Sequence, residues 1–331
     1  MFKPATLTEA GGSNFMFYMI HTNAPLQEKM NLFWHSLFAT GVSKVDNYDE
    51  IMDMIDKFRE NGMGNYKQIL SDVAKSPAMI YWLDNNENHK DTPNENYGRE
   101  LLELFSMGVG NYTEADIKTA ARAFTGWTFK QPNPIYASCH PEVSFHYRDN
   151  DHDSGLKTFL GESGYFNGQD IIHIIVKRTE TARFISRHLY NFFVSDEPPV
   201  STWSTTEPKD PEAINILVNA YLESDADIRH ILRTLFNSNF FKTSYKSRVK
   251  SPIELVAGIV KMVDKYNFPD PGIVKYIDKT TRMGQSLMNP PTVEGWHTGT
   301  GWINAGTLTE RVNFSIDEVG NKYNPGILSM F

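Results

Sequence analysis

The chain has 331 residues, which is long enough to bury most of its apolar surface without disulfides or a structural metal. Its formal charge of -8 and the lack of a basic run argue against non-specific nucleic-acid binding, so we expect no nucleic-acid partner. The single cysteine, Cys139, excludes an internal disulfide. Aromatic residues make up 13% of the chain, which favours aromatic packing between helices over a base-stacking surface.

The N-terminal segment lacks the pattern of a signal peptide. It contains one lysine, Lys3, and no uninterrupted apolar core. No segment anywhere approaches the roughly 20 apolar residues that a membrane span requires. We therefore expect no membrane span, and a cytoplasmic location if the sequence is complete at its start.

Apolar residues recur at helical spacing through most of the chain and predict an all-α fold, a multi-helix bundle. Pro25 opens the first strong helix and Gly41 follows its end. Thr113 is a helix cap, and Pro77 kinks or divides its helix. The predicted helices cover residues 25–40, 48–59, 66–83, 95–107, 114–127, 168–177, 179–194, 210–224, 225–237, 251–266, 272–288 and 307–319.

Two segments depart from the helical pattern. Residues 129–166 form a long non-periodic region, rich in Pro, Asp, His and Gly, and regions of that length tend to be functional or disordered. Its aromatic residues favour an ordered one. Residues 289–304 contain Trp296 and Trp302 among prolines and glycines, which indicates a short loop fixed to the protein body by its aromatic rings. We expect a single domain over residues 1–331, with a division into two lobes near residues 195–209 as the alternative.

The chain contains several long motifs. They are FWHSLFAT (33–40), NENYGRELLELFSMGVGNYTEADIKTAARAFTGW (94–127), HDSGLKTFLGESGYFNGQDII (152–172), TARFISRHLYNFF (181–193), SPIELV (251–256) and MGQSLMNPPTVEGWHTGTGWINAGTLTERVNF (283–314). Together these motifs resemble one bacterial family, catalogued as domain of unknown function 1800. The resemblance implies a helical fold and carries no established activity. Family members are commonly longer and exported. Their first motif usually has a second histidine where this chain has Leu37.

The helix after Pro93 carries a group of charged residues. Arg99 can pair with Glu95 and Glu103 at a spacing of four. Glu100 and Glu103 lie nearly one above the other on the helix. Two interpretations remain open: a carboxylate pair that binds a metal, as in helical bundles with Glu and His ligands, or a salt-bridge ladder that faces solvent.

His35 lies among apolar residues of the helix predicted over 25–40. A lone histidine on such a helix is more often a core residue than a ligand. We keep it as a metal-ligand candidate that depends on whether the helix with Glu100 and Glu103 packs nearby.

The segment HYRDNDHDSG, residues 146–155, is the third candidate. Its alternating aspartates resemble the start of a calcium-binding loop, but Ser154 and Leu160 stand where that loop needs glycine and glutamate. His146, His152 and Asp153 instead suit metal ligands, or a base with its orienting group, and Lys157 suits an anion. The alternative is a polar turn whose aspartates bond their own backbone.

The leading hypothesis from the sequence is a metal-dependent enzyme, oxidative or hydrolytic. Its site would lie between the helix bundle and the region 129–166, with a divalent zinc, iron or manganese ion. The competing hypothesis is a non-catalytic binding or assembly protein with a protein partner and a structural Arg/Glu network. The residues assigned to catalysis are His152, Asp153, Arg99 and Lys157, and those assigned to the metal are His35, Glu100, Glu103, His146 and His152.

Overall fold

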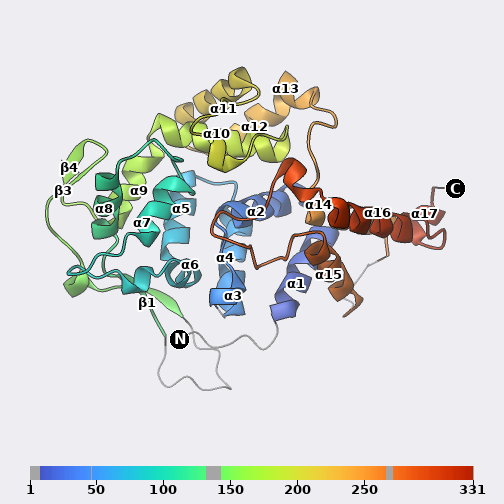
Figure 1. Ribbon diagram of the computed structural model, residues 1–331, viewed down its shortest axis with the longest axis horizontal. Coiled ribbons are helices and arrows are strands. Elements are labelled where there is room, and N and C mark those ends of the chain that lie inside the picture. Colours follow the sequence, from blue (N-terminus) through green and yellow to red (C-terminus); the bar gives the residue numbers. More distant parts are fainter. Residues whose placement is uncertain (1–7, 46, 132–142, 266–270, 331) are drawn as a thin grey trace.

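The computed structural model describes residues 8–45, 47–131, 143–265 and 271–330. Within them the chain forms seventeen α-helices and two small antiparallel sheets of two strands each (Figure 1). The predicted all-α class is therefore confirmed. No helix in these ranges is both long enough and apolar enough to cross a membrane.

The first part of the chain is helical. Its helices are α1 (Thr8–His21), α2 (Pro25–Leu37), α3 (Val42–Val45), α4 (Tyr48–Asn61), α5 (Tyr66–Lys75), α6 (Pro77–Trp82), α7 (Asn96–Glu103) and α8 (Glu114–Ala123). Helix α2 packs against α1 and α4. Its Phe33 and Trp34 are buried among other aromatic rings, which is the packing that the aromatic content predicts.

The predicted irregular region contains two hairpins instead of one continuous loop. Strand β1 (Trp127–Lys130) pairs with β2 (Ser144–Tyr147), and β3 (Lys157–Phe159) pairs with β4 (Glu162–Gly164). Strands of three or four residues are too short to give a recognisable alternation in the sequence. Residues 132–142, including Cys139, lie outside the described residues.

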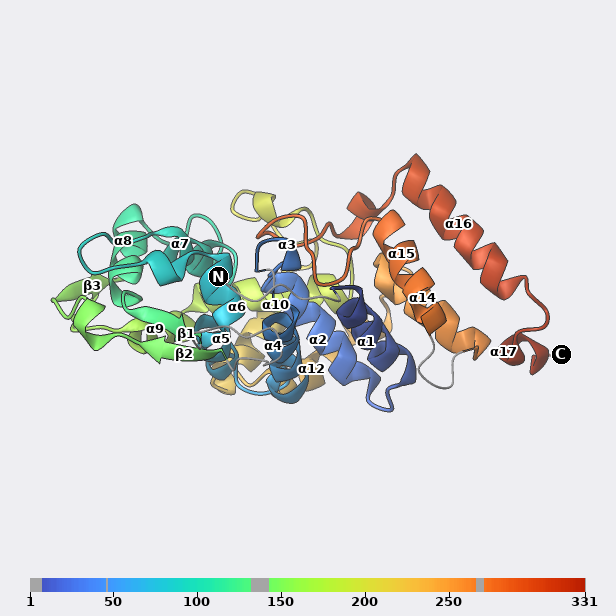
Figure 2. The same ribbon diagram turned by 90° about the horizontal axis from the view of Figure 1, so that it is seen from below.

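The second part of the chain returns to helices. They are α9 (Gly168–Val176), α10 (Thr179–Phe193), α11 (Pro211–Glu223), α12 (Ile228–Asn237), α13 (Asn239–Lys242), α14 (Pro252–Val263), α15 (Val274–Arg282), α16 (Ala305–Val319) and α17 (Pro325–Leu328). Helix α10 packs against α11, and α14 packs against α1, α15 and α16. Figure 2 shows α16 along the far end of an elongated molecule.

Local sequence signals set several helix ends. Thr113 and Asp116 form a capping box at the start of α8, and Pro77 opens α6 after Ser76 leaves the helical conformation. Several predicted helices extend too far. Helices α2 and α7 end at Leu37 and Glu103, where the predicted ends are residues 40 and 107. Helix α8 stops at Ala123 because Gly126 has a φ of 79° and turns the chain into β1. Helix α15 stops at Arg282, just before Gly284 with a φ of 98°. Helix α1 was not predicted at all.

Residues 196–209 form a closed loop against α10, which we call the Ω-loop. The backbone N–H of Lys209 donates to Glu197 Oε1 at 3.0 Å, and the backbone N–H of Glu197 donates to Asn191 Oδ1 at 2.9 Å. These bonds hold the two ends of the loop together and to the helix. The proposed division into two lobes at this segment stays a prediction.

Candidate functional site

The segment predicted to carry catalysis is held by an ion pair. Asp153 Oδ2 accepts a hydrogen bond from Arg122 Nε at 2.6 Å, and Asp153 Oδ1 accepts one from the backbone N–H of Gly155 at 2.8 Å. The Arg122 guanidinium lowers the pKa of Asp153 to about 2. Both carboxylate oxygens are thus occupied by partners within the fold.

Lys157 also forms hydrogen bonds with this segment. Its side chain is buried, and its ammonium group donates to the carbonyl oxygens of Asp153 and Gly155. Burial lowers the pKa of Lys157, while the neighbouring Asp153 raises it. The structure therefore gives this lysine two carbonyl partners in its own loop, and Asp153 Oδ1 lies 3.8 Å from its Nζ atom.

The two loop histidines, His146 and His152, contact different neighbours. His152 Nδ1 lies 3.0 Å from the backbone oxygen of Thr125, and its ring lies near that of Tyr147. His146 belongs to β2, opposite Thr128 of β1. Burial and the positive charges of Lys130 and Arg148 lower the pKa of His146.

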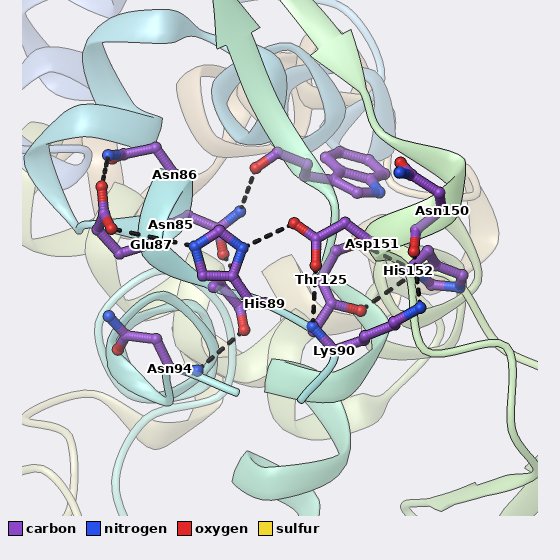
Figure 3. Close-up of polar contacts among 12 residues, drawn as sticks. Asn85, Asn86, Glu87, His89, Lys90, Asn94, Thr125, Asn150, Asp151 and His152 are labelled. Carbon is purple, nitrogen blue, oxygen red and sulfur yellow. Dashed lines mark hydrogen bonds and ion pairs between the residues drawn. The ribbon is translucent and has the colours of Figure 1, made fainter. Parts of the chain in front are cut away.

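The structure also contains a neighbouring polar network that was not predicted from the sequence. His89 Nδ1 lies 2.7 Å from Asp151 Oδ2, and Lys90 Nζ donates to the backbone oxygen of Asn150 at 2.8 Å. Figure 3 shows this contact and the asparagines around it. Asn85 Nδ2 donates to the backbone oxygen of Trp127 at 2.9 Å. The asparagine-rich run at 85–94 was the signal in the sequence for this network. The network connects residues 85–94 to residues 148–152. We call this network, together with the hydrogen bonds of Asp153, the loop clamp.

The residues assigned to a metal are not brought together. His35 is fully buried on α2, between the rings of Phe15 and Trp296, and burial lowers its pKa to about 4. His146 and His152 belong to the hairpin region instead. In the described part of the chain, no three His, Cys, Asp or Glu side chains are grouped so that they could hold a metal ion. The ligand set proposed from the sequence therefore does not form a site there, because its members face different neighbours.

The charged residues of α7 divide between two environments. Arg99 contacts Glu95 at 3.2 Å and Glu114 at 2.9 Å, so the predicted pairing with Glu95 is found and Glu114 takes the second place expected for Glu103. Glu103 instead accepts a hydrogen bond from the Tyr112 hydroxyl at 2.9 Å. Burial, Glu103 and Glu294 raise the pKa of Glu100 to about 7.

The described residues enclose an open cavity of about 1080 Å³. Its walls come from α2, the end of α7, α10, the Ω-loop and the loop 291–302, which we call the Trp loop. The Trp loop closes against the Ω-loop, because a Cβ on Gly299 would lie 3.1 Å from Asp196 Cγ. Clefts of this size with a few convergent polar groups are the usual location of ligand sites.

One wall of this cavity holds a buried ion pair. Arg187 Nε donates to Glu197 Oε2 at 2.8 Å, and Arg187 Nη1 donates to the backbone oxygen of Thr206 at 2.9 Å. The side chains of Arg187 and Glu197 are 6% and 0% exposed, so the pair is screened from water. Arg187 Nη2 is buried and has no hydrogen-bond partner among the described residues.

His188 follows on the same helix and lines the same cavity. Its Nε2 atom is also buried and lacks a partner in the described ranges. Burial and the charge of Arg187 lower the pKa of His188 to about 3, so the ring is neutral. The Trp203 ring lies against both residues, with its centroid 4.5 Å from Arg187 Cζ and 4.6 Å from the His188 ring centroid.

The Trp loop forms another wall of the cavity. Trp296 and Trp302 are 8% and 5% exposed, which agrees with a loop fixed by its aromatic rings. Trp296 packs on His35 from the other side, and the rings of His297 and Trp302 lie edge to face. Glu294, in the same loop, lines the cavity together with Glu103.

Sequence reasoning missed Arg187, His188 and Glu197. The available signal was the polar run Ser186–Arg187–His188 inside an otherwise apolar helix. A buried arginine and histidine in such a helix need partners, and the partner of Arg187 comes from a loop that the helical pattern does not cover.

Comparison with known proteins adds a family but no activity. No curated protein and no solved structure matches the chain significantly. A family model described as a protein of unknown function, DUF1800, matches residues 4–319, which agrees with the motifs identified in the sequence. With nearly its whole length covered by this match, the chain belongs to the DUF1800 family.

Proposed function

We propose that this protein binds a small organic ligand in the cavity between α10, the Ω-loop and the Trp loop. The observation that carries the proposal is a large open cavity lined by Arg187, His188 and Trp296, each of which has a buried side-chain nitrogen without a hydrogen-bond partner among the described residues. An unsatisfied buried polar group costs about 1–3 kcal/mol, so a fold that keeps several beside a cavity favours a ligand that satisfies them.

The composition of the walls supports a ligand with an apolar body. Phe33, Phe184 and Phe192 line the cavity together with three tryptophans, Trp203, Trp296 and Trp302. Flat aromatic surfaces of this kind bind rings and aliphatic chains, and a few polar groups orient them. The loop clamp supports this function less, because its charged groups already have partners.

The test is a fragment screen by ligand-observed NMR, with toluene and indole as simple apolar probes. A matched pair of variants locates the binding. Ser204→Trp places a large side chain at the cavity wall, whereas Ser329→Trp adds the same side chain at an exposed position near α17. We expect the first variant to lose probe binding and the second to retain it. Absence of binding by the unaltered protein, or equal binding by both variants, would contradict the proposal.

A second candidate function is self-assembly through α16. Leu308, Val312 and Ile316 recur every four residues and are 48%, 48% and 64% exposed. We infer that a second copy of this chain covers this aliphatic stripe, since a stripe without charged members can pair with itself across a two-fold axis. Light scattering tests it: a dimer that Ile316→Glu converts to a monomer supports assembly, and a monomer at high protein concentration contradicts it.

A further inference from the structure

Arg187 and His188 supply hydrogen-bond capacity to the cavity without supplying net charge. The charge of Arg187 is balanced by Glu197 at 2.8 Å, and His188 is neutral because of its burial beside Arg187. What remains on each side chain is one nitrogen without a partner among the described residues. Because Arg187 Nη2 can only donate, the polar part of a ligand that satisfies it must be an acceptor.

The other cations that line the cavity have contacts of their own. Arg248 pairs with Glu254, Lys209 Nζ donates to the backbone oxygen of Asp196, and Arg183 Nη2 donates to Asn215 Oδ1 at 3.2 Å. Glu197 places negative charge beside Arg187, and Asp196 adds a carboxylate to the cavity lining. A carboxylate ligand would add another buried negative charge, and an uncompensated buried charge is far more costly than a neutral hydrogen-bonded group.

The Trp203 ring contacts both residues. It lies on the guanidinium group of Arg187 and beside the ring of His188, and its Nε1 donates to the backbone oxygen of Pro198 at 2.8 Å. The two nitrogen atoms have no solvent contact in this arrangement, so a neighbouring side chain has to move before a ligand reaches them.

We infer that the cavity selects ligands with a neutral carbonyl oxygen, as in an amide or a ketone. Arg187 Nη2 and His188 Nε2 donate hydrogen bonds to this oxygen after the Trp203 ring moves aside. This inference rests on the proposed function and adds the chemical class of the ligand. A carbonyl oxygen has two lone pairs and accepts both donors, provided that His188 carries its proton on Nε2.

Benzamide and benzoate are the matched probes, because they share a ring and differ in the charge of the acceptor group. We expect benzamide to bind the unaltered protein at least about tenfold more tightly than benzoate, a difference of about 1.4 kcal/mol. Increasing the salt concentration should leave benzamide binding unchanged. The amide and acid comparison needs no variant, so it does not depend on whether a substituted protein folds.

Two variants test whether His188 contacts the carbonyl oxygen of the ligand. His188→Phe removes the ring nitrogen and keeps an aromatic side chain, while His173→Phe makes the same change at an exposed histidine of α9. Loss of benzamide binding in the first variant only supports the inference. Equal or tighter binding of benzoate, or benzamide binding unaffected by His188→Phe, overturns it. In those cases continued toluene binding would leave the proposed function standing.

Discussion

The loop clamp and the cavity wall both collect charged side chains, but they differ in how their polar atoms are satisfied. In the loop clamp, Asp153 has partners on both oxygens and the buried Lys157 donates to two carbonyl oxygens. In the cavity wall, Arg187 and His188 each keep a buried nitrogen without a partner in the described residues. A polar cluster whose groups are fully bonded to one another is explained by the fold, whereas one with unused capacity beside a cavity is the better candidate for binding.

The largest effect is expected when the ion pair of the cavity wall is broken. Glu197→Ala leaves the Arg187 charge buried and uncompensated, which should lower the free energy of unfolding by about 3–5 kcal/mol. Urea unfolding measures the loss. Glu207→Ala, at an exposed glutamate of the same Ω-loop, is the control and should change little. A loss as small as that of the control would show that the wall does not depend on this pair.

His35 behind the Trp loop gives a prediction in pH. Its pKa of about 4 in the folded protein lies below the ordinary value of 6.5, so the unfolded chain binds a proton first as the pH falls. This lowers stability progressively between those two values, and at about pH 5 the loss reaches about 2 kcal/mol.

We expect His35→Phe to remove this part of the pH dependence and to be more stable than the unaltered protein at the acidic end. Urea unfolding at neutral and acidic pH tests it, with His173→Phe as the control that keeps the slope. If His35→Phe keeps the full slope, His35 is not a buried neutral histidine.

The loop clamp should respond more moderately. Asp153→Asn removes the ion pair with Arg122, whose side chain is 35% exposed, and screening by solvent limits the loss to about 1 kcal/mol at neutral pH. The folded pKa of about 2 lies below the unfolded value, so this stabilisation is present above about pH 4 and disappears as the pH falls through the folded value. Unfolding at several pH values measures it, and a difference that persists at the lowest pH would exclude the ionic cause.

The smallest effect is expected at the surface of α7. Arg99 is 36% exposed and its partner Glu114 lies in solvent, so Arg99→Ala should change the melting temperature by little more than the error of the measurement. A large loss would show that the Arg/Glu network is structural, as the alternative hypothesis from the sequence supposed. A loss of toluene binding would instead connect Arg99 to the cavity.

Much of the fold was predictable because helices are local. The periodicity of apolar residues located most of the long helices, and Thr113 and Pro77 marked two of their starts correctly. The errors fell where local signals are weak or misleading. Four strands of three or four residues carry no readable alternation, and Gly126 ended α8 earlier than its apolar pattern indicated.

The sequence by itself determined the helical class, the aromatic core and the family, because these depend on spacing and motif along the chain. Only the tertiary structure decided which polar residues meet. His89 reaches Asp151 across 62 positions, and Arg187 finds Glu197 through the closure of the Ω-loop. Helical spacing indicates which face of a helix is buried but not what covers it. His35 became a core residue, separate from the glutamates of α7, because Phe15 and Trp296 pack against its ring.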